Sequence, residues 1–222
     1  MKIKLGILFG GKSVEHEVSI ISALQAAASI DRTKYDVVYL YMTRENTFFT
    51  GEAAGNIENY RHGLKAVTSE CQQVLLIPAD GRVELVRYPM KKLGNNLVDT
   101  LDVIFPIVHG TNVEDGALQG YLKTLGVPFV GCDVLASALG MDKYMMKCVW
   151  KEAGLPVLPC LKTGIKDYLA GPENFLDQVE RKIGYPVIVK PVDLGSSVGV
   201  RKAGSREALA EAMDYAFQFA RI

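Results

Sequence analysis

The feature that most constrains the fold is an apolar segment at residues 3–9 that stops at the pair Gly10-Gly11. A short apolar run bounded by glycine is typical of a buried strand. A second apolar segment follows at residues 36–42. The stretch between these two segments has apolar residues at helical spacing, at Val18, Ile21, Leu24 and Ala28. This order predicts two parallel strands joined by a right-handed crossover helix, with Ser13 as its N-cap.

The pattern changes between residues 44 and 96, which are polar and irregular at first. Apolar segments at residues 74–77 and 83–86 flank an Asp80-Gly81 turn, which predicts a β-hairpin. We interpret this stretch as an insertion or as an antiparallel extension of the sheet. Parallel order is expected to return at residues 101–108, followed by a loop, a helix and a short strand at Pro128, Phe129 and Val130.

A second structural unit is expected to begin near Cys132. Periodicity predicts three helices, at residues 142–153, at 175–183 and from 208 towards the end, and a strand at 186–191 with an antiparallel return at 200–202. The expected fold class is therefore α/β. A three-layer parallel-sheet domain covers residues 1–131, and an α+β subdomain covers residues 132–222.

Composition excludes several classes of partner. With 25 basic and 25 acidic residues, the chain has no long-range field to gather nucleic acid or an anionic membrane. No segment approaches the ~20 apolar residues of a membrane span, and the first apolar stretch is too short for a signal peptide. The four cysteines form no CxxC pair, which disfavours a zinc site. We expect a reduced, cytoplasmic protein with a small-molecule partner.

Residues 6–13 match the phosphate-loop pattern GxxxxGK[ST], but the match is misleading. In a true P-loop the residues between the glycines form a loop whose amides cradle phosphate. Here Ile7, Leu8 and Phe9 belong to the predicted strand, and no second apolar strand ends in an aspartate suited to magnesium. We therefore do not assign a P-loop.

The loop after the first strand carries two acids, Glu15 and Glu17. Glycines after a strand let another group approach the backbone, and a helix N-terminus favours negative charge. Both acids could merely complement the helix dipole. The alternative is that Glu15 lies over the carboxyl edge of the sheet, where ligands bind and where a carboxylate suits an ammonium group.

A second loop, HGTNVEDG, begins at His109 directly after a predicted strand and leads into a helix. A histidine beside two acids in a glycine-bounded loop is a candidate site residue. Glu114 and Asp115 have a structural alternative, which is capping of the helix.

Lys190 ends the apolar strand PVIVK, where its charge must reach water or an anion. The residues that follow, DLGSSVG, are rich in free amides and hydroxyls, which suit phosphate oxygens, although a plain flexible hairpin is the alternative. Lys143 opens another helix, where a cation either lies at the surface or faces a bound anion. The strand lysine and the Gly-Ser loop together favour a nucleotide.

Four sequence blocks together resemble D-alanine–D-alanine ligases of the ATP-grasp superfamily. They are GGKSVEHEVS at residues 10–19, HGTNVEDGALQG at 109–120, SALGMDK at 137–143 and VIVKPVDLGSSVGV at 187–200. They occur in the family's order at compatible spacing and cover nearly the whole chain. The resemblance implies that residues 132–222 form the first, small ATP-grasp subdomain. It also implies a homodimeric enzyme that uses ATP and Mg²⁺ to make D-alanyl-D-alanine for peptidoglycan synthesis.

The resemblance also implies roles for individual residues. Glu15 and Ser196 would be catalytic, with Glu15 binding the ammonium group of the first D-alanine, His109 beside it, and Ser196 positioning Glu15 and the substrate. Lys143 and Lys190 would bind the ATP phosphates. A loop that closes over the triphosphate would be formed by Gly195, Ser196, Ser197 and Gly199. In the implied reaction an acyl phosphate forms first, and the second D-alanine's amine then displaces phosphate.

Two departures from the family pattern restrict these expectations. Val113 stands where the family usually has a glycine, and family members continue well beyond Ile222. The further part would supply the magnesium ligands, so we expect no metal site in this chain and no catalysis by it alone. Three functions stay open: this ligase, a D-alanine–D-lactate or D-alanine–D-serine ligase, and a non-catalytic substrate-binding or dimerisation fragment.

Overall fold

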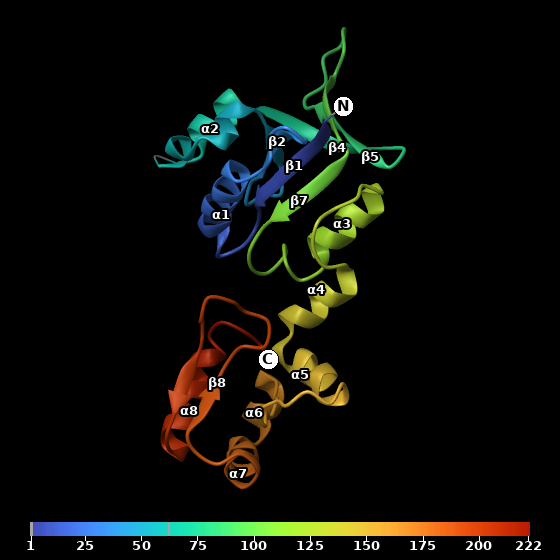
Figure 1. The fold of residues 1–222 in the computed structure, drawn as a ribbon. Helices are drawn as coiled ribbons and strands as arrows, with labels where there is room; N and C mark the ends of the chain where they lie inside the picture. The colour runs from blue at the N-terminus through green and yellow to red at the C-terminus, as the bar shows by residue number, and fades with distance from the viewer. Residues whose placement is uncertain (1, 62) are drawn as a thin grey trace. The chain divides into compact units, whose positions relative to one another are not determined.

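Two units make up the structure, a computed structural model that describes residues 2–61 and 63–222 (Figure 1). The first unit ends at Ser137 and the second is Ala138–Ile222. The domain boundary expected between residues 131 and 132 stays a prediction.

The first unit is built on a seven-stranded sheet. Its elements, in chain order, are β1 (Ile3–Gly10), α1 (His16–Ala28), β2 (Tyr35–Met42), β3 (Phe48–Thr50), the short 3₁₀ helices η1 (Glu52–Gly55) and η2 (Ile57–Tyr60), α2 (Lys65–Glu70), β4 (Gln72–Ala79), β5 (Arg82–Arg87), β6 (Leu97–Leu101), β7 (Val103–Ile107) and α3 (Ala117–Leu125). The strands lie in the order β6-β5-β4-β3-β2-β1-β7.

The predicted strand–helix–strand arrangement is confirmed, because β1 runs parallel to β2 on one side and to β7 on the other. The predicted hairpin is also present: β4 and β5 are antiparallel and joined at Asp80 and Gly81, with φ of 43° and 77°. The pairs β2–β3, β3–β4 and β5–β6 are antiparallel too. The irregular stretch therefore extends the sheet, which is mixed instead of wholly parallel, and its strands β3 and β6 were not predicted.

Alternate residues of β1 enter two different cores. Leu8 lies in the core that includes α3, whereas Ile7 and Phe9 lie in the core that includes α1 and α2. Figure 1 shows α1 and α3 on opposite faces of the sheet. Successive side chains of a strand point to opposite faces of the sheet, so both sets are buried only when helices cover both faces. The arrangement confirms the predicted three-layer α/β architecture.

Helix α1 starts later than its sequence pattern indicates, and the face that it buries differs from the predicted one. It begins at His16 with Glu15 in the N-cap position, so the predicted N-cap role of Ser13 is wrong. Val18 and Ile21, two of the apolar residues that predict the helix, are each 50% exposed. The buried residues are His16, Ser19, Ile20, Ala23 and Ala27. The start of the inner face is polar because its side chains bind the backbone of the neighbouring loops.

Helix α4 (Val134–Met141) runs across the division between the units and was not predicted. The second unit continues with α5 (Lys143–Glu152), α6 (Ile165–Ala170), α7 (Pro172–Lys182), β8 (Val187–Val189), β9 (Arg201–Ala203) and α8 (Arg206–Ala216). β8 and β9 pair antiparallel, as predicted, and share a core with α7 and α8. Arg206 fastens α8 to α7 through ion pairs with Glu173, Asp177 and Glu180.

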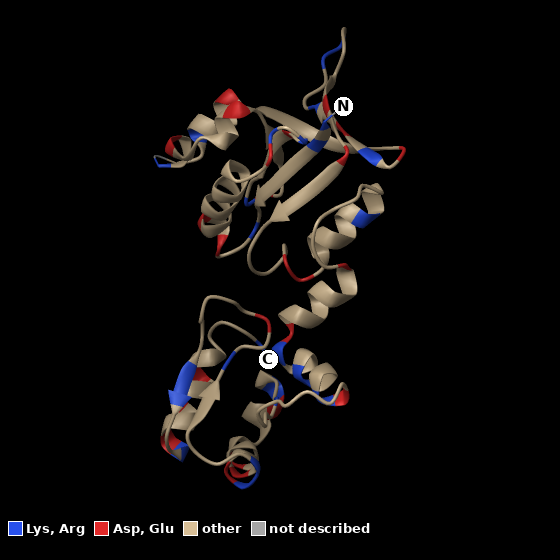
Figure 2. Ribbon diagram, in the orientation of Figure 1, with Lys and Arg blue, Asp and Glu red and all other residues tan. Residues whose placement is uncertain are grey.

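Acidic and basic residues are distributed over both units, and neither sign is confined to one of them (Figure 2). In the ranges that the structure describes, no helix has the length and apolar character needed to cross a membrane.

Candidate functional site

Two loops of the first unit meet at the carboxyl ends of β1 and β7. The Ser13 hydroxyl donates to the carbonyl oxygen of His109 (2.5 Å), and the Asn112 side-chain amide donates to the carbonyl oxygen of Lys12 (3.0 Å). Because β1 and β7 are parallel neighbours, their carboxyl ends share the edge where ligands bind in such sheets. Figure 1 shows both loops on this side of the sheet. The structure thus brings the two candidate loops together.

Glu15 and Glu17 have different surroundings although they lie two residues apart. Arg44 donates to both carboxylate oxygens of Glu17, at 2.8 and 2.9 Å, and these bonds lower the pKa of Glu17. The half-buried Glu15 instead lies against the second loop, since a Cβ added to Gly110 would be 2.8 Å from its Oε2. Glu17 therefore forms a structural ion pair with Arg44. Glu15 is the acid that lies at the carboxyl edge of the sheet.

His109 lies directly before Gly110 and is half-buried. Its Nε2 is 3.1 Å from the hydroxyl of Ser22, which lies on α1. A carboxylate and an imidazole are thus placed at one edge of the sheet. The carboxylate can bind an ammonium group, and the imidazole offers a further hydrogen-bonding group to the same ligand.

Glu114 and Asp115 bind the backbone of their own loop. Their carboxylates accept from the amides of Gly110 (2.5 Å), Asn112 (2.7 Å) and Ala117 (3.2 Å). Asp115 thus bonds to the first amide of α3, close to the predicted capping role, whereas Glu114 does not cap the helix and instead closes the loop on Gly110. Val113, which departs from the family pattern, is fully buried and fills the space against Gly11.

In the second unit, Lys143 joins α5 to the segment before the Gly-Ser loop. Its Nζ donates to the carbonyl oxygens of Leu194 (2.6 Å) and Val192 (3.3 Å). Burial lowers the pKa of Lys143, and the positive charge of Lys190 adds to this effect against the opposing charge of Asp193. Two lysines therefore share one region of the second unit, which an anionic ligand would stabilise.

The Gly-Ser loop has an unusual backbone. Ser196 and Ser197 have φ of 48° and 60°, and Gly199 has φ of 71°. A left-handed conformation at a residue with a side chain costs about 1–3 kcal/mol and is characteristic of ligand-binding segments. Turns within the loop bond the amides of Val198 and Val200 to the carbonyl oxygens of Gly195 (3.1 Å) and Ser197 (3.2 Å).

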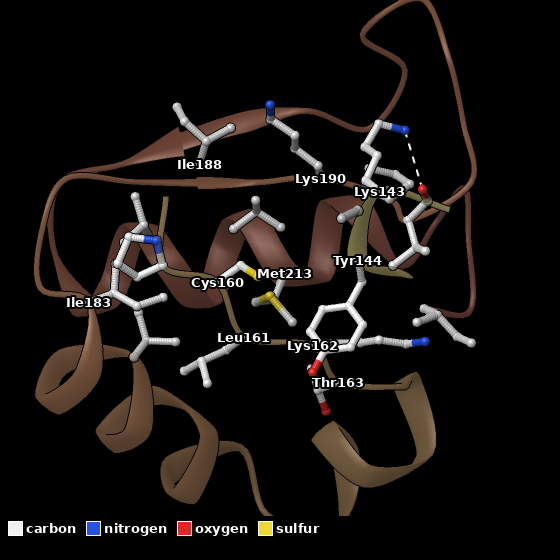
Figure 3. Close-up of a pocket in the computed structure, with 18 of the residues that line it drawn as sticks. Lys143, Tyr144, Cys160, Leu161, Lys162, Thr163, Ile183, Ile188, Lys190 and Met213 are labelled. Atoms are coloured by element: carbon white, nitrogen blue, oxygen red, sulfur yellow. Dashed lines mark hydrogen bonds between the residues drawn. The ribbon is translucent and has the colours of Figure 1, made fainter. Parts of the chain in front are cut away.

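A cavity of about 500 Å³ lies beside this loop within the second unit (Figure 3). Lys143 and Lys190 both line it, and the dashed line in Figure 3 marks the bond from Lys143 to the carbonyl oxygen of Val192. Much of the remaining lining is apolar, including Leu161, Ile188 and Met213. Four lysines line the cavity, Lys143, Lys147, Lys162 and Lys190, and a largely apolar cavity with such cations suits a ligand that has an apolar or aromatic body and an anionic group.

One wall of this cavity was missed from the sequence. Residues 158–163 line it but have no regular structure, so they gave no periodic pattern. Within that wall the ammonium group of Lys162 lies 5.3 Å from the ring centre of Tyr144. In the first unit Arg44 and Ser22 were also missed, because their partners lie 27 and 87 residues away in the chain.

The magnesium ion implied by the resemblance can be tested against the acids near the loop. Asp142 caps α5 by accepting from the amides of Tyr144 and Met145, and Asp193 lies close enough to Lys143 to raise its pKa. Within residues 2–61 and 63–222 no group of three or more His, Cys, Asp or Glu side chains is arranged to hold a metal ion. These acids do not fit a magnesium site.

Comparisons with known proteins identify the family to which the chain is similar. Two family profiles match, one described as D-ala D-ala ligase N-terminus over residues 4–132 and one as D-ala D-ala ligase C-terminus over residues 149–222. A D-alanine–D-alanine ligase from Geobacillus kaustophilus is 42% identical over 224 residues, which is 100% of this chain and 59% of that protein.

Two solved structures are also similar. The D-alanine–D-alanine ligase from Coxiella burnetii has a TM-score of 0.82 at 26% identity, over 99% of this chain and 62% of that one. The VanG D-Ala:D-Ser ligase from Enterococcus faecalis has a TM-score of 0.80 at 29% identity, over 100% of this chain and 61% of that one.

The fold of this chain, a three-layer α/β unit followed by a small α+β unit, is therefore similar to that of solved D-alanine–D-alanine and D-alanine–D-serine ligases over part of their length. The chain belongs to the D-ala D-ala ligase family, whose N-terminal profile alone matches more than half of it. It spans 59% of the length of the Geobacillus relative.

Proposed function

We propose that this chain provides the first-substrate and nucleotide sites of an ATP-dependent D-alanine–D-alanine ligase. The observation that carries the proposal is the cavity that Lys143 and Lys190 line beside the Gly-Ser loop. Two ammonium groups can neutralise phosphate oxygens of ATP, and the apolar wall can accept its base. The ligase names of the relatives support D-alanine as the substrate.

The proposed reaction has two steps. A carboxylate oxygen of the first D-alanine attacks the γ-phosphorus of ATP, ADP leaves, and an acyl phosphate forms. The amine of the second D-alanine attacks the acyl carbon, inorganic phosphate leaves, and D-alanyl-D-alanine for peptidoglycan synthesis results. The use of Mg²⁺ stays an expectation from the resemblance, as do the cytoplasmic location and the homodimer.

In this proposal the residues of the first unit bind the amino acid and those of the second unit bind the nucleotide. Glu15 binds the ammonium group of the first D-alanine, and His109 lies beside that substrate. Lys143 and Lys190 bind the ATP phosphates, while the loop with Gly195, Ser196, Ser197 and Gly199 covers them. The part predicted for Ser196 in positioning Glu15 and the substrate stays a prediction.

A second candidate is a ligase with a different second substrate. The D-Ala:D-Ser ligase among the similar structures favours D-serine as the alternative nucleophile. D-lactate was the other alternative that the sequence left open. All three reactions share the first step, so the residues proposed for that step do not distinguish them.

We further propose that residues beyond this chain complete the catalytic site, because the chain spans 59% of the length of its relatives. Phosphoryl transfer requires the charge at the γ-phosphate to be neutralised and water to be excluded. The 222-residue chain alone is therefore expected to form no dipeptide.

The test is a product assay on a full-length form of the protein with ATP, Mg²⁺ and D-alanine, measuring ADP and dipeptide. D-serine and D-lactate are offered in competition as second substrates, L-alanine is the control, and the 222-residue chain is assayed in parallel. D-alanine-dependent formation of ADP and dipeptide supports the proposal. ADP formation that does not respond to D-alanine, or dipeptide made by the short chain at the full rate, contradicts it.

A further inference from the structure

The inner face of α1 and the turn before it form a row of polar side chains spaced three residues apart: Ser13, His16, Ser19 and Ser22. Each bonds to one of the two loops or to the strand ends beneath them. The Ser19 hydroxyl accepts from the amide of Gly10 (2.8 Å) and donates to the carbonyl oxygen of Ile107 (2.6 Å). This row therefore ties the carboxyl ends of β1 and β7 to the helix that follows Glu15.

His16 is the member of this row with an ionisable side chain, and it is 1% exposed. Its Nδ1 lies 2.7 Å from the carbonyl oxygen of Gly11, and its Nε2 lies 2.9 Å from the hydroxyl of Tyr41. A carbonyl oxygen only accepts, so Nδ1 must carry a proton. In the neutral ring Nε2 is then the acceptor, and the hydroxyl of Tyr41 donates to it.

Gly11 is held on both sides by these bonds. Its amide donates to the carbonyl oxygen of Met42 (2.7 Å), and its own carbonyl oxygen accepts from Nδ1 of His16 and from the amide of Ser13 (3.0 Å). With φ of 90°, Gly11 is in the left-handed region, which glycine adopts readily, and a Cβ added there would collide with the side chains of Met42 and Val113. His16 is also the residue next to Glu15, whose amide donates to the Ser13 hydroxyl (3.0 Å). The backbone of Glu15 is thus restrained on one side by the hydroxyl of Ser13 and on the other by the buried side chain of His16.

We propose that His16 is a positioning residue for the amino-acid site: its bond to the Gly11 carbonyl sets the turn that places Glu15. The inference rests on the proposed function, in which Glu15 binds the substrate ammonium group. His16 itself touches no substrate. An apolar side chain of similar size would fill the same space, but it would remove the side-chain donor to the Gly11 carbonyl, which would keep only the amide of Ser13 (3.0 Å).

Two near-isosteric variants separate positioning from packing. An asparagine amide can place a donor near the position of Nδ1, so His16→Asn keeps the bond to Gly11 and loses the one to Tyr41. Glutamine reaches the position of Nε2, so His16→Gln keeps the bond to Tyr41 and loses the one to Gly11. Both variants are assayed in the full-length protein for the KM of the first D-alanine, the KM of ATP and thermal stability.

We expect His16→Gln to raise the D-alanine KM about tenfold above that of His16→Asn, with the ATP KM of both within about twofold of wild type. The same D-alanine KM in both variants would overturn the proposal, as would loss of folding in both. If the wild-type protein shows no D-alanine-dependent ADP formation, the proposed function fails instead. NMR of the wild-type imidazole supplies a readout without activity: a proton on Nδ1 is expected, and its absence would overturn the proposed bond.

Discussion

The two units hold their candidate ligand loops in different ways. In the first unit, the side chains of Ser13, His16 and Arg44 bind the loop backbone and leave little freedom around Glu15. In the second unit, the loop around Ser196 and Ser197 is shaped by its own strained turns and by Lys143, which bonds to the carbonyls before it. A small amino acid offers few atoms to recognise and needs fixed partners. A triphosphate offers many equivalent oxygens, so a loop rich in amides and two lysines suffices.

Breaking the fixed turn of the first unit should have the largest effect. Gly10 has φ of 92°, and an added Cβ would collide with the backbone carbonyl oxygen of Met42. We expect Gly10→Ala to lower the free energy of unfolding by about 3 kcal/mol or more, because strain and a backbone clash add. Denaturant unfolding followed by circular dichroism measures it.

The control for that substitution is Gly126→Ala. Gly126 also has a positive φ, 69°, but a Cβ there meets no atom within 4 Å. It should cost only about 1 kcal/mol. Equal losses in the two variants would show that close packing against Met42 does not restrain the turn at Gly10.

The lysine pair of the second unit is tested by Lys190→Ala. Removing a charge-assisted contact of about 1.5–3 kcal/mol should weaken ATP binding roughly ten- to a hundredfold. Calorimetric titration of the full-length protein with ATP measures this. Lys202→Ala is the matched control, since Lys202 lies on β9 and is exposed but does not line the cavity. Unchanged ATP affinity in Lys190→Ala would remove Lys190 from the nucleotide site.

The amino-acid site is tested by Glu15→Gln, which keeps the size of the side chain and removes its charge. We expect the KM of the first D-alanine to rise about tenfold with little change in the KM of ATP, because an ammonium group loses its ionic partner. Glu17→Gln is the neighbouring control, and it should leave both KM values near wild type because Glu17 is bound to Arg44. A defect in ATP binding in Glu15→Gln would show that assigning Glu15 to the amino-acid site is wrong.

The smallest effect concerns the ion pair itself. Bonding to Arg44 lowers the pKa of Glu17 below its usual value of 4.5, so its contribution to stability is present above that pH and is lost as pH falls through the lowered pKa. Since 70% of the Glu17 side chain is exposed, the contribution should be about 0.5 kcal/mol or less. The melting temperatures of wild type and Glu17→Gln should therefore differ slightly at pH 7 and converge once the pH falls below the lowered pKa of Glu17. A gap that widens on acidification would contradict this assignment.

Much of the fold could be predicted because its signals are local. The glycine pair after β1, the Asp80-Gly81 turn and the helical spacing along α8 each depend on a few neighbouring residues. The four sequence blocks also predicted the family. Elements without such signals, such as β3, β6 and α4, were missed because three to eight residues carry little periodic information.

The sequence by itself therefore determined the order of the main elements, the family and the two candidate loops of the first unit. Only the tertiary structure decided what each polar side chain contacts. It assigned Glu17 to Arg44, Ser13 to the carbonyl oxygen of His109, and His16 to Gly11 and Tyr41. It also turned the polar face of α1 inward, against the apolar pattern. The physical reason is that spacing along the chain reports the local backbone, whereas the partner of a buried donor or charge is set by strands and loops that can lie nearly a hundred residues away.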